Sequence, residues 1–222
     1  MRILILGATG AVGILLIRRA LKFLESCEVV LYVRSSEKIP HDLRSNPSVT
    51  VIQGQLTDQQ SLTRAFDDVH IVLSALGPSV AKGPFHPTNT PLAKTYLSII
   101  DIMHQKGIKR LICLGTASIK DPADRFSLAF SILVNGVAIG ARTAYNDMVA
   151  IGENVRAHGG DLEWTIVRVP LLTNQESEDV IAGYVGDGRT NTWLSRAGYA
   201  AFVIDEIGKR NWVKKAPLIC SK

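Results

Sequence analysis

The chain has 222 residues, of which 46% are hydrophobic and 20% charged, and its formal net charge is +5. This length fits one α/β domain with a substantial core, and the composition excludes a disordered or fibrous protein. The basic residues form no long run, which argues against an arm that binds nucleic acid or a membrane surface.

The N-terminal segment carries the most informative motif. Residues 3–6 form an apolar run that predicts a buried parallel strand, and residues 12–24 have the pattern of an amphipathic helix. Gly7, Gly10 and Gly13 have the spacing of a dinucleotide-binding turn. In such a turn, Gly7 would permit a tight turn, Gly10 would let the backbone approach a diphosphate, and Gly13 would let the helix pack closely on the strand. The helix N-terminus would then face the diphosphate. The alternative is a glycine-rich turn without a ligand.

Strands and helices alternate along the rest of the chain. Apolar runs predict strands at residues 28–33, 49–53, 69–75, 110–114 and 162–169. Capping residues and apolar periodicity predict helices at residues 58–66, 89–106 and 142–158. This order predicts the α/β class, as a Rossmann-like doubly wound parallel sheet in a single domain that spans residues 1–222.

Two segments depart from the alternation. Within a helical insertion at about residues 122–141, residues 126–141 are an apolar helix candidate, shorter than the roughly 20 residues needed to cross a bilayer. This helix is either a core or dimer-interface helix, or an apolar wall or lid of a substrate pocket. The polar, glycine-containing residues 173–193 indicate either a mobile loop over a cofactor or an ordinary excursion. They belong to a C-terminal region, about 171–222, expected on the substrate side.

The strand ends suggest how a cofactor would bind. The predicted second strand is followed by Arg34 and Ser35 with no acidic residue until Glu37, which favours the 2′-phosphate of NADP over the free hydroxyl of NAD. The alternative for Arg34 is a solvated charge at a strand end. After the third strand, Gln55 and Leu56 are placed to cap the adenine ring.

These motifs resemble a known family. The residues that carry the resemblance are Gly-Ala-Thr-Gly-Ala-Val-Gly at 7–13 and the stretches 33–35, 54–56, 75–77, 115–118 and 164–172. They are similar to the atypical short-chain dehydrogenases/reductases and, more narrowly, to NAD(P)H-binding proteins related to flavin/biliverdin-IXβ reductase and to NmrA. The likeness covers nearly the whole chain, although its first motif is shared by the entire superfamily.

The resemblance implies a set of NADP(H)-binding residues, with the last three against the nicotinamide. Together with the motifs, it indicates Gly7, Thr9, Gly10, Ala11, Val12, Gly13, Arg34, Ser35, Gln55, Leu56, Ala75, Leu76, Gly77, Pro170, Leu171 and Leu172. It also implies a hydroxyl, that of Thr116, beside the nicotinamide and the substrate. The chain departs from the family at Gln55, which replaces a common acidic residue, and at the apolar insertion.

The usual proton donor of the superfamily is absent. It is a tyrosine followed four residues later by a lysine, and none of the five tyrosines has that partner. Tyr145 lies where the catalytic helix should begin and could still donate a proton; alternatively it packs on the sheet with its hydroxyl bonded. Thr116 and Ser118 could orient an acceptor. These three are the candidate catalytic residues.

We therefore expect an NADPH-dependent oxidoreductase that reduces a small hydrophobic or conjugated substrate, such as a flavin, quinone, tetrapyrrole or natural-product intermediate. The alternatives are an NADP-binding redox sensor without turnover and a cofactor-assisted isomerase. The chain would be a monomer or homodimer, without nucleic acid or a membrane span. Three isolated cysteines in apolar stretches indicate buried free thiols and a cytoplasmic protein.

A metal site is not expected, because the histidines are scattered without ligand spacing. His86, in the loop at residues 83–87, could overhang the active site or face solvent.

Overall fold

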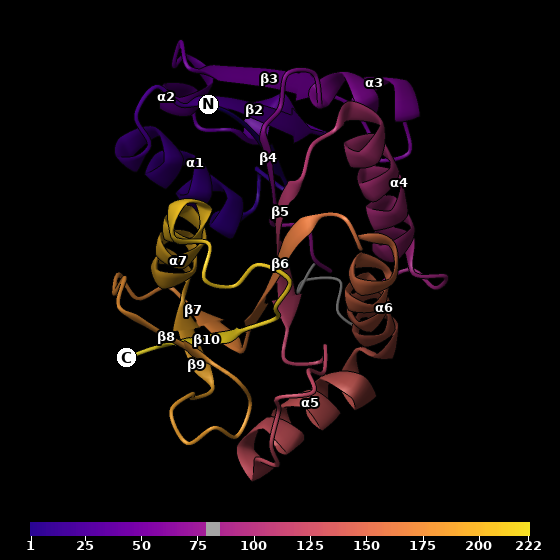
Figure 1. Ribbon diagram of the computed structural model, residues 1–222, viewed down its shortest axis with the longest axis vertical. Helices are drawn as coiled ribbons and strands as arrows, with labels where there is room; N and C mark the ends of the chain where they lie inside the picture. The colour runs from indigo at the N-terminus through magenta and orange to yellow at the C-terminus, as the bar shows by residue number, and fades with distance from the viewer. Residues whose placement is uncertain (79–84) are drawn as a thin grey trace.

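The computed structural model describes residues 1–78 and 85–222 (Figure 1). Its strands are β1 (Arg2–Leu6), β2 (Glu28–Val33), β3 (Val49–Gln53), β4 (Ile71–Ser74), β5 (Arg110–Thr116), β6 (Glu163–Val169), β7 (Leu171–Thr173), β8 (Val180–Gly183), β9 (Trp193–Ser195) and β10 (Leu218–Ser221). Its α-helices are α1 (Ala11–Phe23), α2 (His41–Arg44), α3 (Gln59–Ala65), α4 (Pro91–Lys106), α5 (Leu128–Gly140), α6 (Arg142–His158) and α7 (Arg196–Lys209).

The main sheet confirms the predicted fold class. Its strand order is β3-β2-β1-β4-β5-β6-β10-β8, and every neighbouring pair is parallel except β10 and β8. The chain moves outward from β1 in one direction and from β4 in the other, so the topological switch point lies between these two strands. In such sheets, ligands bind beyond the carboxyl ends of the strands at this point.

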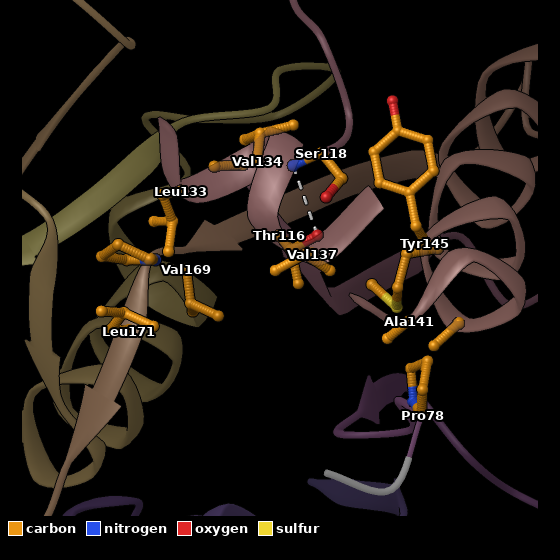
Figure 2. Close-up of a pocket in the computed structure, with 14 residues that line it drawn as sticks. Pro78, Thr116, Ser118, Leu133, Val134, Val137, Ala141, Tyr145, Val169 and Leu171 are labelled. Carbon is orange, nitrogen blue, oxygen red and sulfur yellow. Dashed lines mark hydrogen bonds between the residues drawn. The ribbon is translucent and has the colours of Figure 1, made fainter. Parts of the chain in front are cut away.

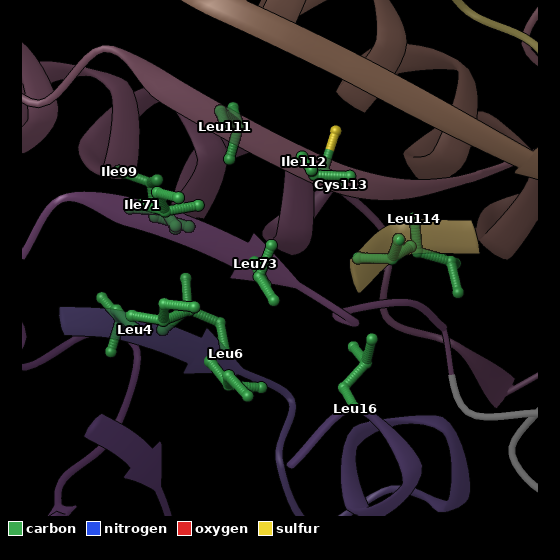
Figure 3. Packing of buried hydrophobic residues seen from close by; sticks show 14 of the residues in the cluster. Leu4, Leu6, Leu16, Ile71, Leu73, Ile99, Leu111, Ile112, Cys113 and Leu114 are labelled. Carbon is green, nitrogen blue, oxygen red and sulfur yellow. The ribbon is translucent and has the colours of Figure 1, made fainter. Parts of the chain in front are cut away.

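Both faces of the sheet are covered, which explains the uninterrupted apolar runs of its central strands. Helices α1 and α7 pack together, as do α4 and α6 (Figure 1). Figure 3 shows Leu4 of β1, Leu73 of β4 and Ile112 of β5 in the same cluster as Leu16 of α1 and Ile99 of α4. Each such fully buried side chain contributes about 1.5–3 kcal/mol of hydrophobic free energy.

The predicted boundaries differ from the structure mainly at strand ends. Strands β2 and β3 and helix α6 have the predicted limits, whereas β4 is shorter than residues 69–75 and β5 extends to Thr116. Asp68 adopts a positive φ of 59°, and the amide of Val69 donates to the Phe66 carbonyl, so the chain is still turning where a strand was expected.

Residues 173–193, expected to be either a mobile loop over a cofactor or an ordinary excursion, contain a strand that the sequence did not predict. Strand β8 lies inside this segment and adds an antiparallel edge strand next to β10. The following turn is closed by Asp187, whose carboxylate accepts the amide hydrogens of Tyr184, Arg189 and Thr190. Strand β8 ends at Gly183, and its partner β10 begins 35 residues later, at Leu218. No local sequence pattern therefore reveals the pairing.

The apolar insertion forms a helix, α5, but it is not a core helix. Only Phe130 of its 13 residues is buried. In Figure 1 α5 lies at the end of the molecule remote from α1 and α3. Within residues 1–78 and 85–222, no single helix is long and apolar enough to cross a membrane; α5 and α6 reach that length only as a pair bent by 116°.

Candidate functional site

The glycine turn between β1 and α1 contains glycines with two different roles. Gly7 has φ +76°, and a Cβ there would lie 2.8 Å from the Ala75 carbonyl, while a Cβ at Gly13 would lie 2.7 Å from the Ala8 Cα. The fold itself therefore requires these two glycines. Gly10 has an ordinary φ of −78°, and its Cβ would meet only the Gly7 oxygen, at 3.4 Å. The protein's own packing leaves the space beside Gly10 free.

This space lies at the positive end of α1. Gly10 is the N-cap and provides no side-chain cap, and the first turn of the helix contains no acidic residue. Among the described residues none accepts a hydrogen bond from the amides of Ala11, Val12 or Gly13. Free amide donors, an uncompensated helix dipole and an open cradle are the features that fit a diphosphate group.

The turn after β3 is held by a tyrosine that the sequence motifs did not point to. Burial raises the pKa of Tyr32, so its hydroxyl is protonated and donates to the Gln55 carbonyl oxygen over 2.7 Å. A Cβ at Gly54 would overlap that hydroxyl, so glycine makes room for the ring. Tyr32 thus fixes the position of the Gln55–Leu56 turn beside the end of β2.

Arg34 follows β2 directly and is exposed. Among residues 1–78 and 85–222, no carboxylate forms an ion pair with its guanidinium. Ser35 is half-buried next to it. An unpaired guanidinium beside a hydroxyl at the end of the second strand can hold a phosphate on an adenine ribose.

The turn after β4 packs against the glycine turn at the switch point. The Ala75 amide donates to the Leu6 carbonyl over 2.9 Å, and the Ala75 carbonyl is the group that excludes a side chain at Gly7. At Gly77, a Cβ would meet only the Leu114 side chain, at 3.4 Å. The backbone after β4 is therefore close to the glycine turn and open on its other side.

A cavity of about 340 Å³ lies next to these turns, at the carboxyl ends of β5 and β6 (Figure 2). The residues that line it are Pro78, Thr116, Ala117, Ser118, Leu133, Val134, Val137, Ala141, Ala144, Tyr145, Met148, Val169, Pro170 and Leu171. The structure thus brings together five of the residues expected near the nicotinamide or the substrate; Leu172 is not among the lining residues. Their chemical roles stay predictions.

Among the described residues that line this pocket, the polar side chains are the three hydroxyls of Thr116, Ser118 and Tyr145, and none is charged. The Ser118 amide donates to the Thr116 hydroxyl oxygen over 3.4 Å (Figure 2). Among the described residues none hydrogen-bonds the Tyr145 hydroxyl, which points away from Pro78 in Figure 2. The alternative role of Tyr145, in which a hydrogen bond from its hydroxyl anchors the ring to the sheet, is therefore not supported by the described part of the chain.

Helix α5 forms one wall of the pocket through Leu133, Val134 and Val137. Phe130 attaches the helix to the domain, packing in a small cluster with Ala117, Val185 and Leu218. Of the alternatives raised by the sequence, a pocket wall agrees with the structure and a core helix does not, while a dimer-interface helix stays a prediction.

The segment before α5 is held by a buried ion pair that sequence reasoning missed. Arg168 is fully buried in β6 and donates to both carboxylate oxygens of Asp124, at 2.7 and 2.8 Å, and to the carbonyls of Ile119 and Ala216. Burial raises the pKa of Asp124, but hydrogen bonds from Arg168 and its charge outweigh burial and lower it. The signal was an arginine between Val167 and Val169, inside the buried part of a strand.

His86 is buried and does not face solvent. Its Nε2 lies 2.7 Å from Asp147, whose carboxylate also accepts the amides of Leu92 and Ala93 at the start of α4. His86 is not among the pocket-lining residues, and residues 83 and 84 of its loop lie outside the described residues. In the described part of the chain, no group of three or more His, Cys, Asp or Glu side chains could hold a metal ion.

The sequence matches the model of a protein family described as NAD(P)H-binding over residues 7–210. The chain belongs to this NAD(P)H-binding family. The match begins at the first glycine of the turn and includes the strand ends around the pocket. It confirms the cofactor class expected from the glycine turn. No curated protein matches the sequence significantly.

Solved structures with the same fold include oxidoreductases. A short-chain dehydrogenase/reductase (wide type) from Veillonella parvula, in complex with NADP, superposes with a TM-score of 0.79 at 18% identity, over 99% of this chain and 94% of that one. ChuY, an anaerobillin reductase from Escherichia coli O157:H7, has a TM-score of 0.75 at 16% identity, over 100% and 97%. At these identities the likeness establishes the fold alone, and it agrees with the Rossmann-like sheet expected from the sequence.

Proposed function

We propose that the protein is an NADPH-dependent reductase of a small, apolar, conjugated substrate. The observation that carries this proposal is the pocket of about 340 Å³ that Pro78 borders after the turn at the end of β4, whose described lining consists of apolar side chains and three hydroxyls. An apolar pocket with a few convergent polar groups is typical of a small-molecule site. When bound, the reduced nicotinamide supplies a hydride.

The lining of the pocket supports an uncharged substrate. A carboxylate or ammonium group buried among Leu133, Val134 and Val137 would lose hydration without gaining a charged partner. An aromatic or polyene ring system would instead gain about 25 cal/mol for each Å² of apolar surface removed from water.

The hydroxyls support the reduction of a conjugated acceptor. Thr116, Ser118 and Tyr145 can donate hydrogen bonds to a carbonyl oxygen and hold it in one orientation. Among the described lining residues there is no carboxylic acid, histidine or lysine, so within residues 1–78 and 85–222 the proton donors of the pocket are its hydroxyls. A conjugated acceptor, such as a quinone, flavin, tetrapyrrole or enone, delocalises the developing charge and therefore depends less on a strong acid.

The free guanidinium of Arg34 supports NADPH over NADH, since a planar cation binds phosphate strongly and a neutral ribose hydroxyl weakly. ChuY, which shares the fold, is named as an anaerobillin reductase. We therefore include tetrapyrroles among the acceptors to be tested with this protein.

The test is the oxidation of NADPH, followed by its absorbance, against a panel of quinones, flavins, tetrapyrroles and enones. Turnover with at least one acceptor, lost about tenfold or more in Thr116→Val with an unchanged NADPH Kd, is the expected result. A Ser131→Ala variant, which removes a hydroxyl of α5 that does not line the pocket, is the matched control.

The alternatives give different results in the same experiment. Tight NADPH binding by calorimetry without oxidation by any acceptor would favour an NADP sensor. Interconversion of a substrate without net consumption of NADPH would favour an isomerase. Either result would overturn the reductase.

A further inference from the structure

Helix α5 is apolar on two opposite sides. At 100° per residue, Phe130, Leu133, Val134, Val137 and Ala141 form one stripe, which packs inward or lines the pocket. Leu128, Ile132 and Ile139 form a second stripe about 180° away. The outer side chains are 66%, 66% and 86% exposed, and small residues separate the two stripes.

Three of the ten exposed large hydrophobic residues in the described part of the chain form this outer stripe, Leu128, Ile132 and Ile139. Phe126, also exposed, lies just before the helix, whereas the exposed Val137 belongs to the inner stripe. No charged residue occurs between positions 126 and 141. A helix face of this kind can bury its apolar side chains only against an apolar surface outside the domain.

Basic residues flank the apolar segment on both sides. Lys120 and Arg125 precede it and Arg142 follows it, and all three are exposed. In the described part of the chain, none of them forms an ion pair, whereas the nearby Asp121 and Asp124 are paired with arginines. Among the described residues, one further carboxylate near Arg125 has no ion-pair partner: Asp187, which follows Gly186 and accepts only amide and hydroxyl hydrogens. The three unpaired cations outnumber it, so the surface around the outer stripe is net positive.

We propose that the outer face of α5, defined as Leu128, Ile132 and Ile139 with the flanking Arg125 and Arg142, binds the surface of an anionic lipid bilayer. The apolar side chains would enter the boundary between headgroups and acyl chains, and the arginines would contact anionic headgroups. This is a peripheral contact that lies along the membrane and does not span it.

A second copy of the chain fits this face less well. Two α5 helices related by a twofold axis pair either parallel or antiparallel, and in both cases cations meet cations because both ends are basic. The face is also small. A 13-residue helix is about 20 Å long, so a strip about 10 Å wide covers about 200 Å², against about 800 Å² per partner in a stable interface.

The test is flotation of the full chain with vesicles of phosphatidylcholine alone and of phosphatidylcholine mixed with phosphatidylserine. We expect binding to the mixed vesicles and little binding to phosphatidylcholine alone, with binding weakened by salt. The double variant Ile132→Ser, Ile139→Ser should lose at least tenfold in vesicle affinity. Arg125→Gln and Arg142→Gln should each lose about fivefold, and only on anionic vesicles.

The matched control is Phe23→Ser, which removes an exposed aromatic side chain from α1, far from α5 in Figure 1. Its vesicle affinity should equal that of the unmodified chain. Circular dichroism melts check that every variant is folded, which is expected because the substituted side chains are exposed.

Two results would overturn the proposal. One is the absence of flotation with mixed vesicles at low salt. The other is concentration-dependent self-association that the double isoleucine variant abolishes, with vesicle binding unaffected, which would assign the face to a second copy. The measurement uses no substrate and no cofactor, so its outcome is independent of the proposed reductase activity.

Discussion

Replacing Gly10 by alanine should separate cofactor binding from folding. Gly10 has φ −78° and ψ 159°, which alanine adopts without strain, and the new Cβ would meet only the Gly7 oxygen, at 3.4 Å. The methyl group would instead occupy the free space in front of the α1 N-terminus. We therefore expect NADPH binding to be lost while the fold persists.

The magnitudes follow from this geometry. As an N-cap, alanine is less favourable than glycine by about 0.5–1 kcal/mol. Alanine also lowers the entropy of the unfolded chain, which stabilises the folded state by about 0.4–1 kcal/mol. The free energy of unfolding of Gly10→Ala should therefore stay within about 1 kcal/mol of that of the unmodified chain. Displacing the diphosphate from one or two amide donors removes charge-assisted hydrogen bonds that contribute about 1.5–3 kcal/mol each. The NADPH Kd, measured by calorimetry, should rise by about 10-fold if one weak bond is lost and by more than about 10,000-fold if two strong ones are lost.

Gly13→Ala is the matched comparison, because its Cβ would lie 2.7 Å from the Ala8 Cα and would also overlap the Gly7 carbonyl. This variant should unfold more easily in urea, by about 1–3 kcal/mol. If Gly10→Ala bound NADPH as tightly as the unmodified chain, the assignment of the glycine turn to the diphosphate would be refuted.

Four further expectations test the rest of the site and its support. Arg34→Glu should weaken NADPH binding about tenfold or more without weakening NADH in calorimetry; equal losses would contradict the role of Arg34. Val134→Trp should fill the pocket and lower kcat/KM while NADPH affinity stays unchanged. Arg168→Met leaves Asp124 buried without its partner and should lower the free energy of unfolding by about 3–5 kcal/mol. Burial raises the pKa of Asp187, but its hydrogen bonds outweigh burial and lower the pKa from 3.8 to about 2. The folded state is therefore stabilised by about 1–2 kcal/mol above pH 3.8, and this stabilisation is lost as the pH falls toward 2. Urea titrations across this range should show a smaller acid-induced loss in Asp187→Asn.

The strands of the sheet were predictable because each lies in a continuous apolar run between clear breakers. Strand β2 and helix α6 even have the predicted limits. Strand β8 was not predictable, since Val-Ile-Ala-Gly is short, sits between polar residues, and pairs only with β10 near the end of the chain. Pairing between distant segments depends on tertiary context that a local pattern does not contain.

The candidate site divides in the same way. Spacing alone proposed Gly10 and Arg34, because a diphosphate turn and a phosphate-binding arginine need those residue types at those positions, and their roles stay predictions. The residues that hold the site in place, Tyr32, Asp124 and Asp147, were missed because each acts through a partner far away in the chain. A carboxylate in a sequence gives no indication of whether it will be exposed or buried against such a partner.

The two halves of the site depend on the fold to different degrees. The glycine turn is built from backbone contacts between β1, α1 and the end of β4, so its geometry cannot change without disturbing the centre of the sheet. The pocket wall is one peripheral helix, attached by a single buried phenylalanine and preceded by the Arg168–Asp124 pair. Substitutions along α5 can therefore reshape the pocket at little cost to the domain. If the proposed sites are correct, substitutions along α5 change the turnover of substrates while the affinity for the nicotinamide cofactor stays constant, because no residue of α5 lies in the glycine turn.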